Sequence, residues 1–187
     1  MTALSNEIVS EFCSLCNLAY ESWRLHKLLI DDNPHYDPMR RDKCGGFLER
    51  LSRITQEYAL LQLVKLHDPA VQKNSINLTL EYVITYGGWD EETLSQLKEL
   101  FIKLESLAKK IRPARHKFLS HNDLESILSS AVLGPFQEGA DNEYYKVLQE
   151  FVNIIHIDTY GRPYPFDKTV EKDVQSILDH IPYKEKT

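Results

Sequence analysis

Apolar residues recur at steps of three and four along most of the chain, which is the pattern of helices that bury one face. A first helix is predicted over residues 5–29, with an apolar face formed by Ile8, Phe12, Leu15, Cys16, Ala19 and Trp23. Residues 31–38 contain two prolines among turn-forming residues and predict a loop. A second helix is predicted over residues 46–66, ended by His67-Asp68-Pro69, with Phe47, Leu51, Ile54, Tyr58 and Leu61 facing inward.

The middle of the chain has a less regular pattern. Apolar and other residues alternate over residues 76–84, as in a half-buried strand. No second strand is evident that could pair with this segment. We therefore expect a short helix or an irregular segment that ends at Gly87-Gly88. A third long helix begins near Asp90 with three acidic residues, and its stripe consists of Leu94, Leu97, Leu100, Phe101, Leu104, Leu107, Ala108 and Ile111. Pro113 interrupts this helix and suits the first turn of a new one.

The last third of the chain predicts two further helices. A polar loop over residues 134–142 precedes a helix marked by Tyr144, Val147, Leu148, Phe151, Ile154 and Ile155. Residues 161–165 break the chain, and Val170, Val174, Ile177 and Leu178 mark the last helix. Together these elements predict an all-α bundle of long antiparallel helices, forming one domain over residues 1–187 with a helical extension at about 142–181.

Composition narrows the class of protein. The chain is 42% hydrophobic and 27% charged, which is typical of a globular domain. No stretch approaches the roughly 18 apolar residues of a membrane span, the N-terminus does not read as a signal peptide, and three cysteines are too few for a disulfide framework. We therefore expect a cytoplasmic protein that does not enter a membrane. The net charge of −6 means that an anionic partner must be bound by a local patch.

Residues 109–121 form such a patch, since they contain two histidines and five basic residues and no acidic one. The basic residues are Lys109, Lys110, Arg112, Arg115 and Lys117. Arginine binds phosphate and stabilises charge on phosphorus, while histidine transfers protons near neutral pH, so Arg115 and His121 fit metal-free phosphodiester cleavage. On an ideal helix they lie about 240° apart and do not share a face, and a symmetric dimer could bring two copies of the segment together into one site. A solvated basic helix end is the alternative.

The spacing Arg115-x5-His121 resembles the Arg-x(4 to 6)-His signature of HEPN domains. The surroundings resemble the abortive-infection U-type branch more specifically. There a helix ending in Asp-Pro, like Asp68-Pro69 here, precedes an Arg-polar-Lys-x-x-small-His-x-Asp motif, matched here by residues 115–123. This resemblance is strong over residues 5–123 and weaker beyond.

The resemblance implies a HEPN-type helical bundle that acts as a metal-independent endoribonuclease and homodimer, with a toxin or phage-defence role and an antitoxin partner. It implies that Arg115 binds the scissile phosphate and that His121 is the acid or base. His116 and Asp123 are candidate supporting residues, and Lys109, Lys110, Arg112 and Lys117 are candidate RNA-binding residues. The rival hypothesis is a non-catalytic module of the same fold that binds RNA, a nucleotide or a protein.

Other motifs indicate structure rather than chemistry. Cys13-x-x-Cys16 has no second ligand pair and lies on a helix face, which favours core packing over a zinc site. No nucleotide-cradling glycine motif, His-Glu-x-x-His or Gly-x-Ser-x-Gly is present, so we expect no metal and no cofactor. Five aromatic residues could line a groove, although packing is their commoner use: Tyr144, Tyr145, Tyr160, Tyr164 and Phe166.

Overall fold

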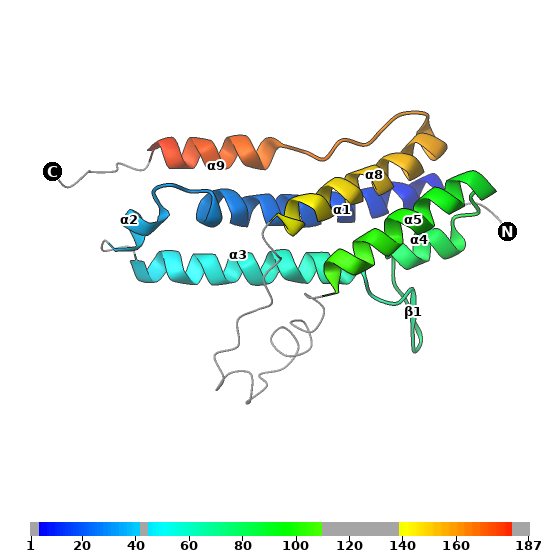
Figure 1. Ribbon diagram of the computed structural model, residues 1–187, viewed down its shortest axis with the longest axis horizontal. Coiled ribbons are helices and arrows are strands. Elements are labelled where there is room, and N and C mark those ends of the chain that lie inside the picture. The colour runs from blue at the N-terminus through cyan, green and yellow to red at the C-terminus, as the bar shows by residue number, and fades with distance from the viewer. Residues whose placement is uncertain (1–3, 42–44, 110–138, 181–187) are drawn as a thin grey trace.

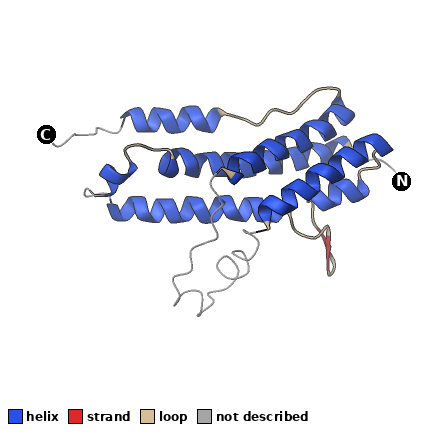
Figure 2. Cartoon of the chain, in the orientation of Figure 1, coloured by secondary structure: helices blue, strands red, loops and turns tan. Residues whose placement is uncertain are grey.

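The protein is an elongated bundle of helices (Figure 1). The computed structural model describes residues 4–41, 45–109 and 139–180. Within these residues the only strands form one short hairpin (Figure 2). The predicted all-α fold is confirmed. None of the helices in this part of the chain is long and apolar enough to cross a membrane.

Helix α1 (Asn6–His26) lies at the centre of the packing. It contacts α3 (Gly45–Leu66), α8 (Ala140–Tyr160) and α9 (Thr169–His180). Helix α8 packs in turn against α5 (Glu91–Ala108). In Figure 1, α1 runs opposite to both α3 and α8, as predicted for long antiparallel helices.

One apolar core joins these helices. Phe12 of α1 and Phe151 of α8 meet with ring centroids 6.0 Å apart, and both are fully buried. The stripes predicted for the third helix and for the helix after residue 142 face this core through Leu97, Leu100, Leu104, Ala108, Tyr144, Val147, Leu148, Phe151 and Ile155. Each buried leucine, isoleucine, valine or phenylalanine among them stabilises the fold by roughly 1.5–3 kcal/mol relative to exposure.

Local chemistry sets the helix ends. The side chains of Ser5 and Asp90 accept hydrogen bonds from the backbone N–H groups of Ile8 (3.4 Å) and Thr93 (2.7 Å), which caps α1 and α5. Helix α8 ends at Gly161, whose φ of 70° favours glycine. Gly87 is required for another reason, since an added Cβ would overlap the indole of Trp89.

The segment after α1 differs from the predicted loop. A π-helical turn, η1 (Lys27–Asp31), continues α1, and a short helix, α2 (Tyr36–Arg40), follows. The loop prediction is correct for residues 32–35 and wrong for residue 31, which ends η1, and for residues 36–38, which belong to α2. Pro38 is only the third residue of α2, where the missing N–H has no helical partner and the helix is undisturbed.

The ambiguous stretch is a short helix preceded by a hairpin. Strands β1 (Val71–Gln72) and β2 (Ser75–Ile76) pair antiparallel, and α4 (Leu80–Tyr86) follows with Thr79 as its cap. The predicted helix is thus present from residue 80. Ile76, where the strand-like pattern starts, pairs with Val71 only five residues earlier, and sequence reasoning missed this partner.

The inward face predicted for the second helix is wrong. Phe47 is 65% exposed and Ile54 is 63% exposed, whereas Leu48, Leu63 and Leu66 are buried. Residues 47, 51, 54, 58 and 61 have perfect helical spacing, but α3 carries a second apolar face. The buried face includes Ala59 and Thr55, and the Thr55 hydroxyl lies 2.8 Å from Nδ1 of His26 in the last turn of α1.

Two substitutions on α5 test this description of the core. Leu104→Ala should lower the free energy of unfolding by about 2–5 kcal/mol, because Leu104 is fully buried and its truncation leaves a cavity. The matched control is Ile102→Ala on the same helix, where Ile102 is 68% exposed and the change should stay within about 0.5 kcal/mol. Urea unfolding, detected by circular dichroism, measures the free energy of unfolding of both variants. Equal decreases in the two variants would contradict the assignment of the buried face of α5.

Candidate functional site

Seven of the eight candidate residues lie outside the described residues: Lys110, Arg112, Arg115, His116, Lys117, His121 and Asp123. Lys109 is described, and it is exposed at the C-terminal end of α5. The described residues show the surroundings of this segment, namely the end of α5 and the start of α8.

A buried histidine joins the helix ends that flank the segment. His67 follows α3 directly, and its side chain is completely buried. Its Nδ1 lies 2.7 Å from Oε1 of Glu105 in the last turn of α5, and its Nε2 lies 2.8 Å from the hydroxyl of Tyr144 near the start of α8. The ends of α3, α5 and α8 therefore meet at one polar cluster, which we call the His67 cluster (His67, Glu105 and Tyr144).

The partners of His67 indicate how its ring is oriented. A carboxylate only accepts hydrogen bonds, so we assign Nδ1 as the donor to Glu105. Nε2 bonds to the Tyr144 hydroxyl. One imidazole ring thus links the three helix ends.

A second cluster fixes the first turn of α8 against α1. The carboxylate of Asp141 lies 3.0 Å from Nζ of Lys27 and accepts a hydrogen bond from Nε1 of Trp23 at 3.1 Å. An acidic side chain at a helix N-terminus is also favoured by the helix dipole. We call these residues the Asp141 cluster.

Opposing effects act on the Asp141 carboxyl. Burial alone raises its pKa, but hydrogen bonds from Lys27, the backbone of Asn142 and Trp23, with the charge of Lys27, more than offset this effect. The pKa of Asp141 is therefore below its ordinary value of 3.8. The carboxylate is ionised at neutral pH and holds Lys27 and Trp23 in place.

The described residues provide no metal site, because no group of three or more potential ligand residues among them is placed to hold an ion. Cys13 and Cys16 are fully buried in α1. Burial raises the pKa of the Cys13 thiol to about 12, so this thiol is protonated and unreactive. The predicted core role of this pair is confirmed.

Comparison with known proteins identifies the family. The family model described as AbiU2, a HEPN family, matches residues 5–177, which is nearly the whole chain. The chain belongs to the AbiU2 family of HEPN domains. No curated protein and no solved structure matches it.

The AbiU2 match extends beyond the predicted resemblance, which was strong only to residue 123. It includes α8 and most of α9, so the predicted C-terminal extension is part of the family domain. It also includes the Asp68-Pro69 helix end. In the structure this end adjoins His67, whose bonds reach both helices flanking the candidate segment.

Sequence reasoning missed the polar residues around the candidate segment. His67 was assigned only to a helix stop, and Tyr144 to an apolar stripe and to a set of aromatic residues that could line a groove. Glu105 and Asp141 carried no signal, since an acidic residue on a helix is normally solvated. Spacing within one helix does not indicate which residues of different helices will meet.

The Asp141 cluster predicts a pH-dependent effect on stability. Asp141→Asn should lower the free energy of unfolding at pH 7 by about 1–3 kcal/mol, since Lys27 loses its closest partner. A carboxyl with a lowered folded-state pKa stabilises above pH 3.8, and this contribution is lost as the pH falls through the folded-state value. The cost of the substitution should therefore shrink as the pH falls below 3.8.

Urea unfolding at pH 7, 5 and 3 measures this difference. Asp158→Asn is the matched control, because Asp158 is an exposed carboxylate on the same helix. It should change stability little at each pH. If Asp141→Asn lowers the free energy of unfolding equally at pH 3 and pH 7, the charge of Asp141 is not what holds Lys27.

Proposed function

We propose that this AbiU2 HEPN domain is a metal-independent endoribonuclease. The observation that carries the proposal is the family match over residues 5–177, combined with Arg115-x5-His121 inside a basic run of an otherwise acidic chain. The His67 cluster supports it, since it ties together the helix ends on either side of this run.

The proposed chemistry follows from the two side chains. The ribose 2′-hydroxyl attacks phosphorus, the bond to the 5′-oxygen breaks, and the products are a cyclic phosphate and a 5′-hydroxyl. A base takes the proton of the 2′-hydroxyl, and an acid protonates the leaving oxygen. His121 supplies one of these roles, and the Arg115 guanidinium stabilises the added charge on phosphorus.

One motif supplies one histidine, whereas the reaction uses both a base and an acid. A symmetric homodimer provides two copies of Arg115 and His121 around one axis, so we propose a composite site between two subunits. His116 and Asp123 are proposed to orient the reacting groups. A toxin or phage-defence role, with an antitoxin that restrains it, follows from the family and forms part of the proposal.

The alternative is a non-catalytic AbiU2 module that binds RNA, a nucleotide or a protein through the same basic run. Family and fold are compatible with both functions. The two differ in turnover, which only the enzyme shows.

Cleavage of RNA in excess chelator tests the catalytic proposal. Wild-type protein should cut RNA, while Arg115→Ala and His121→Ala should lose activity by about 100-fold or more, as for loss of a general acid or base. His180→Ala is the control, since His180 is an exposed histidine at the end of α9 and should leave the rate unchanged.

The helical signal of each variant is checked by circular dichroism. Absence of cleavage by the wild type on both structured and unstructured RNA would favour the binding module. Expression provides a second measurement, because an active toxin should slow growth and either alanine variant should relieve it. Unimpaired growth with the wild type would count against the toxin role.

Replacing the basic residues tests RNA binding separately from cleavage. Alanine at Lys109, Lys110, Arg112 and Lys117 should weaken binding of a 2′-O-methyl oligonucleotide, which lacks the attacking hydroxyl. Each lost phosphate contact should lower the slope of log affinity against log salt by about 0.7. Lys98→Ala on α5 is the control for a general charge effect, and an unchanged slope in the fourfold variant would exclude the basic run as the RNA contact.

A further inference from the structure

The β1–β2 hairpin projects from the bundle shortly after α3 ends (Figure 2). Gln72 pairs with Ser75 at its far end, so Lys73 and Asn74 form a two-residue turn. Every residue of the hairpin, over residues 71–76, is exposed. The hairpin therefore presents its tip to solvent and does not pack on the core.

Hydrogen bonds fix the root of the hairpin on the bundle. The backbone N–H of Asn77 donates to the carbonyl of Ala70 at 2.8 Å, and the Asn77 side-chain amide donates to the carbonyl of Pro69 at 2.8 Å. The backbone N–H of Ala70 donates to the carboxylate of Glu81 on α4 at 2.7 Å. The hairpin is thus held in a defined position, as an element that binds a ligand needs to be.

The turn places lysine in a backbone conformation that it rarely adopts. Lys73 has a φ of 54°, and in the part of the chain that the structure describes it is the only residue other than glycine with a positive φ. A two-residue hairpin turn requires a positive φ at its first position, where glycine, asparagine and aspartate are the usual residues. Lysine there is strained, because its Cβ approaches the following carbonyl oxygen. Such strain points to a role for the side chain.

The side chains of the tip are polar and carry one positive charge. Gln72, Lys73, Asn74 and Ser75 form no hydrogen bond or ion pair through their side chains with other described residues. Residues 69–80 contain no acidic residue, although the whole chain has a net charge of −6. An ammonium group pairs with phosphate, and a carboxamide both donates and accepts hydrogen bonds, as contacts to ribose and bases require.

The root of the hairpin lies near the helix end from which the proposed catalytic segment continues. The hairpin begins four residues after His67, whose Nδ1 lies 2.7 Å from Oε1 of Glu105 in the last turn of α5. The basic run of the proposed ribonuclease starts at Lys109, directly after this turn. An RNA strand held at the start of that run would therefore have the hairpin beside it.

We propose that this hairpin is an RNA contact of the proposed ribonuclease. Lys73 binds a backbone phosphate, and the carboxamides of Gln72 and Asn74 bind the adjoining ribose or base. The inference rests on the proposed function, which supplies the substrate class. It gives the hairpin a role in holding the strand and no role in cleaving it.

The chemistry of the tip favours RNA over other ligands. A free phosphate would meet one lysine and leave the carboxamides without partners. The centres of protein interfaces are depleted of charged residues, whereas the charged residue here is at the tip. The exposed apolar pair of the hairpin, Val71 and Ile76, lies nearer the bundle than Lys73 does, so a large partner meets the charged tip first.

The affinity of the full-length protein for a 2′-O-methyl hexaadenylate, which cannot be cleaved, tests the proposal. Lys73→Asn removes the charge and suits the turn, since asparagine adopts a positive φ more readily than lysine. Its melting temperature should therefore not fall below that of the wild type. Its affinity should fall about tenfold, and the slope of log affinity against log salt should fall by about 0.7, as for one phosphate contact. Lys73→Arg keeps the charge and should retain both values.

Three further variants separate this contact from general effects. Lys172→Asn removes an exposed charge from α9, on the opposite side of the bundle from the hairpin (Figure 1), and should change neither affinity nor slope. Gln72→Ala combined with Asn74→Ala should lower the affinity without changing the slope, because neutral contacts release no counterions. A larger loss of affinity in Ile76→Ser than in Lys73→Asn would indicate an apolar docking surface, as for a protein partner, and would overturn the proposal.

Cleavage of unmodified RNA in excess chelator separates this proposal from the proposed function. If the wild type cuts RNA, Lys73→Asn should raise KM about tenfold and leave kcat unchanged, because the contact is made equally before and during the reaction. If the wild type binds the hexaadenylate but cuts no RNA, the ribonuclease proposal fails, and weaker binding by Lys73→Asn still supports the hairpin contact. Two results overturn the hairpin contact: no binding by the wild type, or a loss of affinity in Lys73→Asn no greater than in Lys172→Asn.

Discussion

Two polar clusters meet at the first turn of α8, one through Asp141 and the other through Tyr144. Apolar packing alone leaves a helix free to slide or rotate by small amounts, because contacts between aliphatic side chains have little direction. Three hydrogen bonds at 2.7–3.1 Å remove that freedom: one from the Trp23 indole to Asp141, and two that join His67 to Glu105 and to Tyr144. The start of α8 is thereby fixed relative to α1, α3 and α5 at once.

This arrangement also bears on the proposed site. Residues 109–123 follow the last turn of α5, and α8 begins at residue 140, so His67 holds the described helices that precede and follow the proposed catalytic residues in the sequence. A site that binds phosphate and transfers protons needs its supporting residues held within about half an ångström.

Much of the fold followed from the amino-acid sequence, because helix stripes and end signals are local. The stripes of α5 and α8 and the stop at His67-Asp68-Pro69 were correctly predicted. The inward face of α3 was predicted wrongly. Its row of apolar residues from Phe47 to Leu61 has the same helical spacing as the face that is buried. Choosing between two such faces depends on the partner helix, which the local pattern does not contain.

The candidate site was predictable only in part, for the same reason. Arg115 and His121 are recognisable by spacing and family, and they stay a prediction because they lie outside the described residues. Glu105, Tyr144 and Asp141 become functional candidates only through contacts with residues 38 or more positions away. Neither composition nor periodicity predicts contacts between residues so far apart in the sequence.

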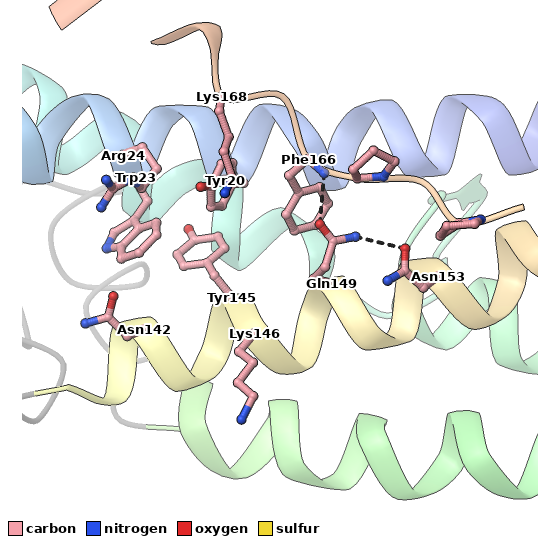
Figure 3. Close-up of a pocket in the computed structure, with 12 residues that line it drawn as sticks. Tyr20, Trp23, Arg24, Asn142, Tyr145, Lys146, Gln149, Asn153, Phe166 and Lys168 are labelled. Atoms are coloured by element: carbon pink, nitrogen blue, oxygen red, sulfur yellow. Dashed lines mark hydrogen bonds between the residues drawn. The ribbon is translucent and has the colours of Figure 1, made fainter. Parts of the chain in front are cut away.

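The attachment of α9 has a consequence for how the molecule opens. Residues 161–168, which connect α8 to α9, are held by hydrogen bonds to the side-chain amides of Gln149 and Asn153 (Figure 3). Helix α9 itself is bonded to α1 through Glu171, which accepts hydrogen bonds from Tyr20 and Arg24. Within α9 only Val174 is buried. A segment with so little apolar contact detaches at a lower free energy than the whole bundle unfolds. Its backbone amides should therefore exchange with solvent well ahead of those in α1 and α8, making the C-terminal arm a separate cooperative unit on a stable core.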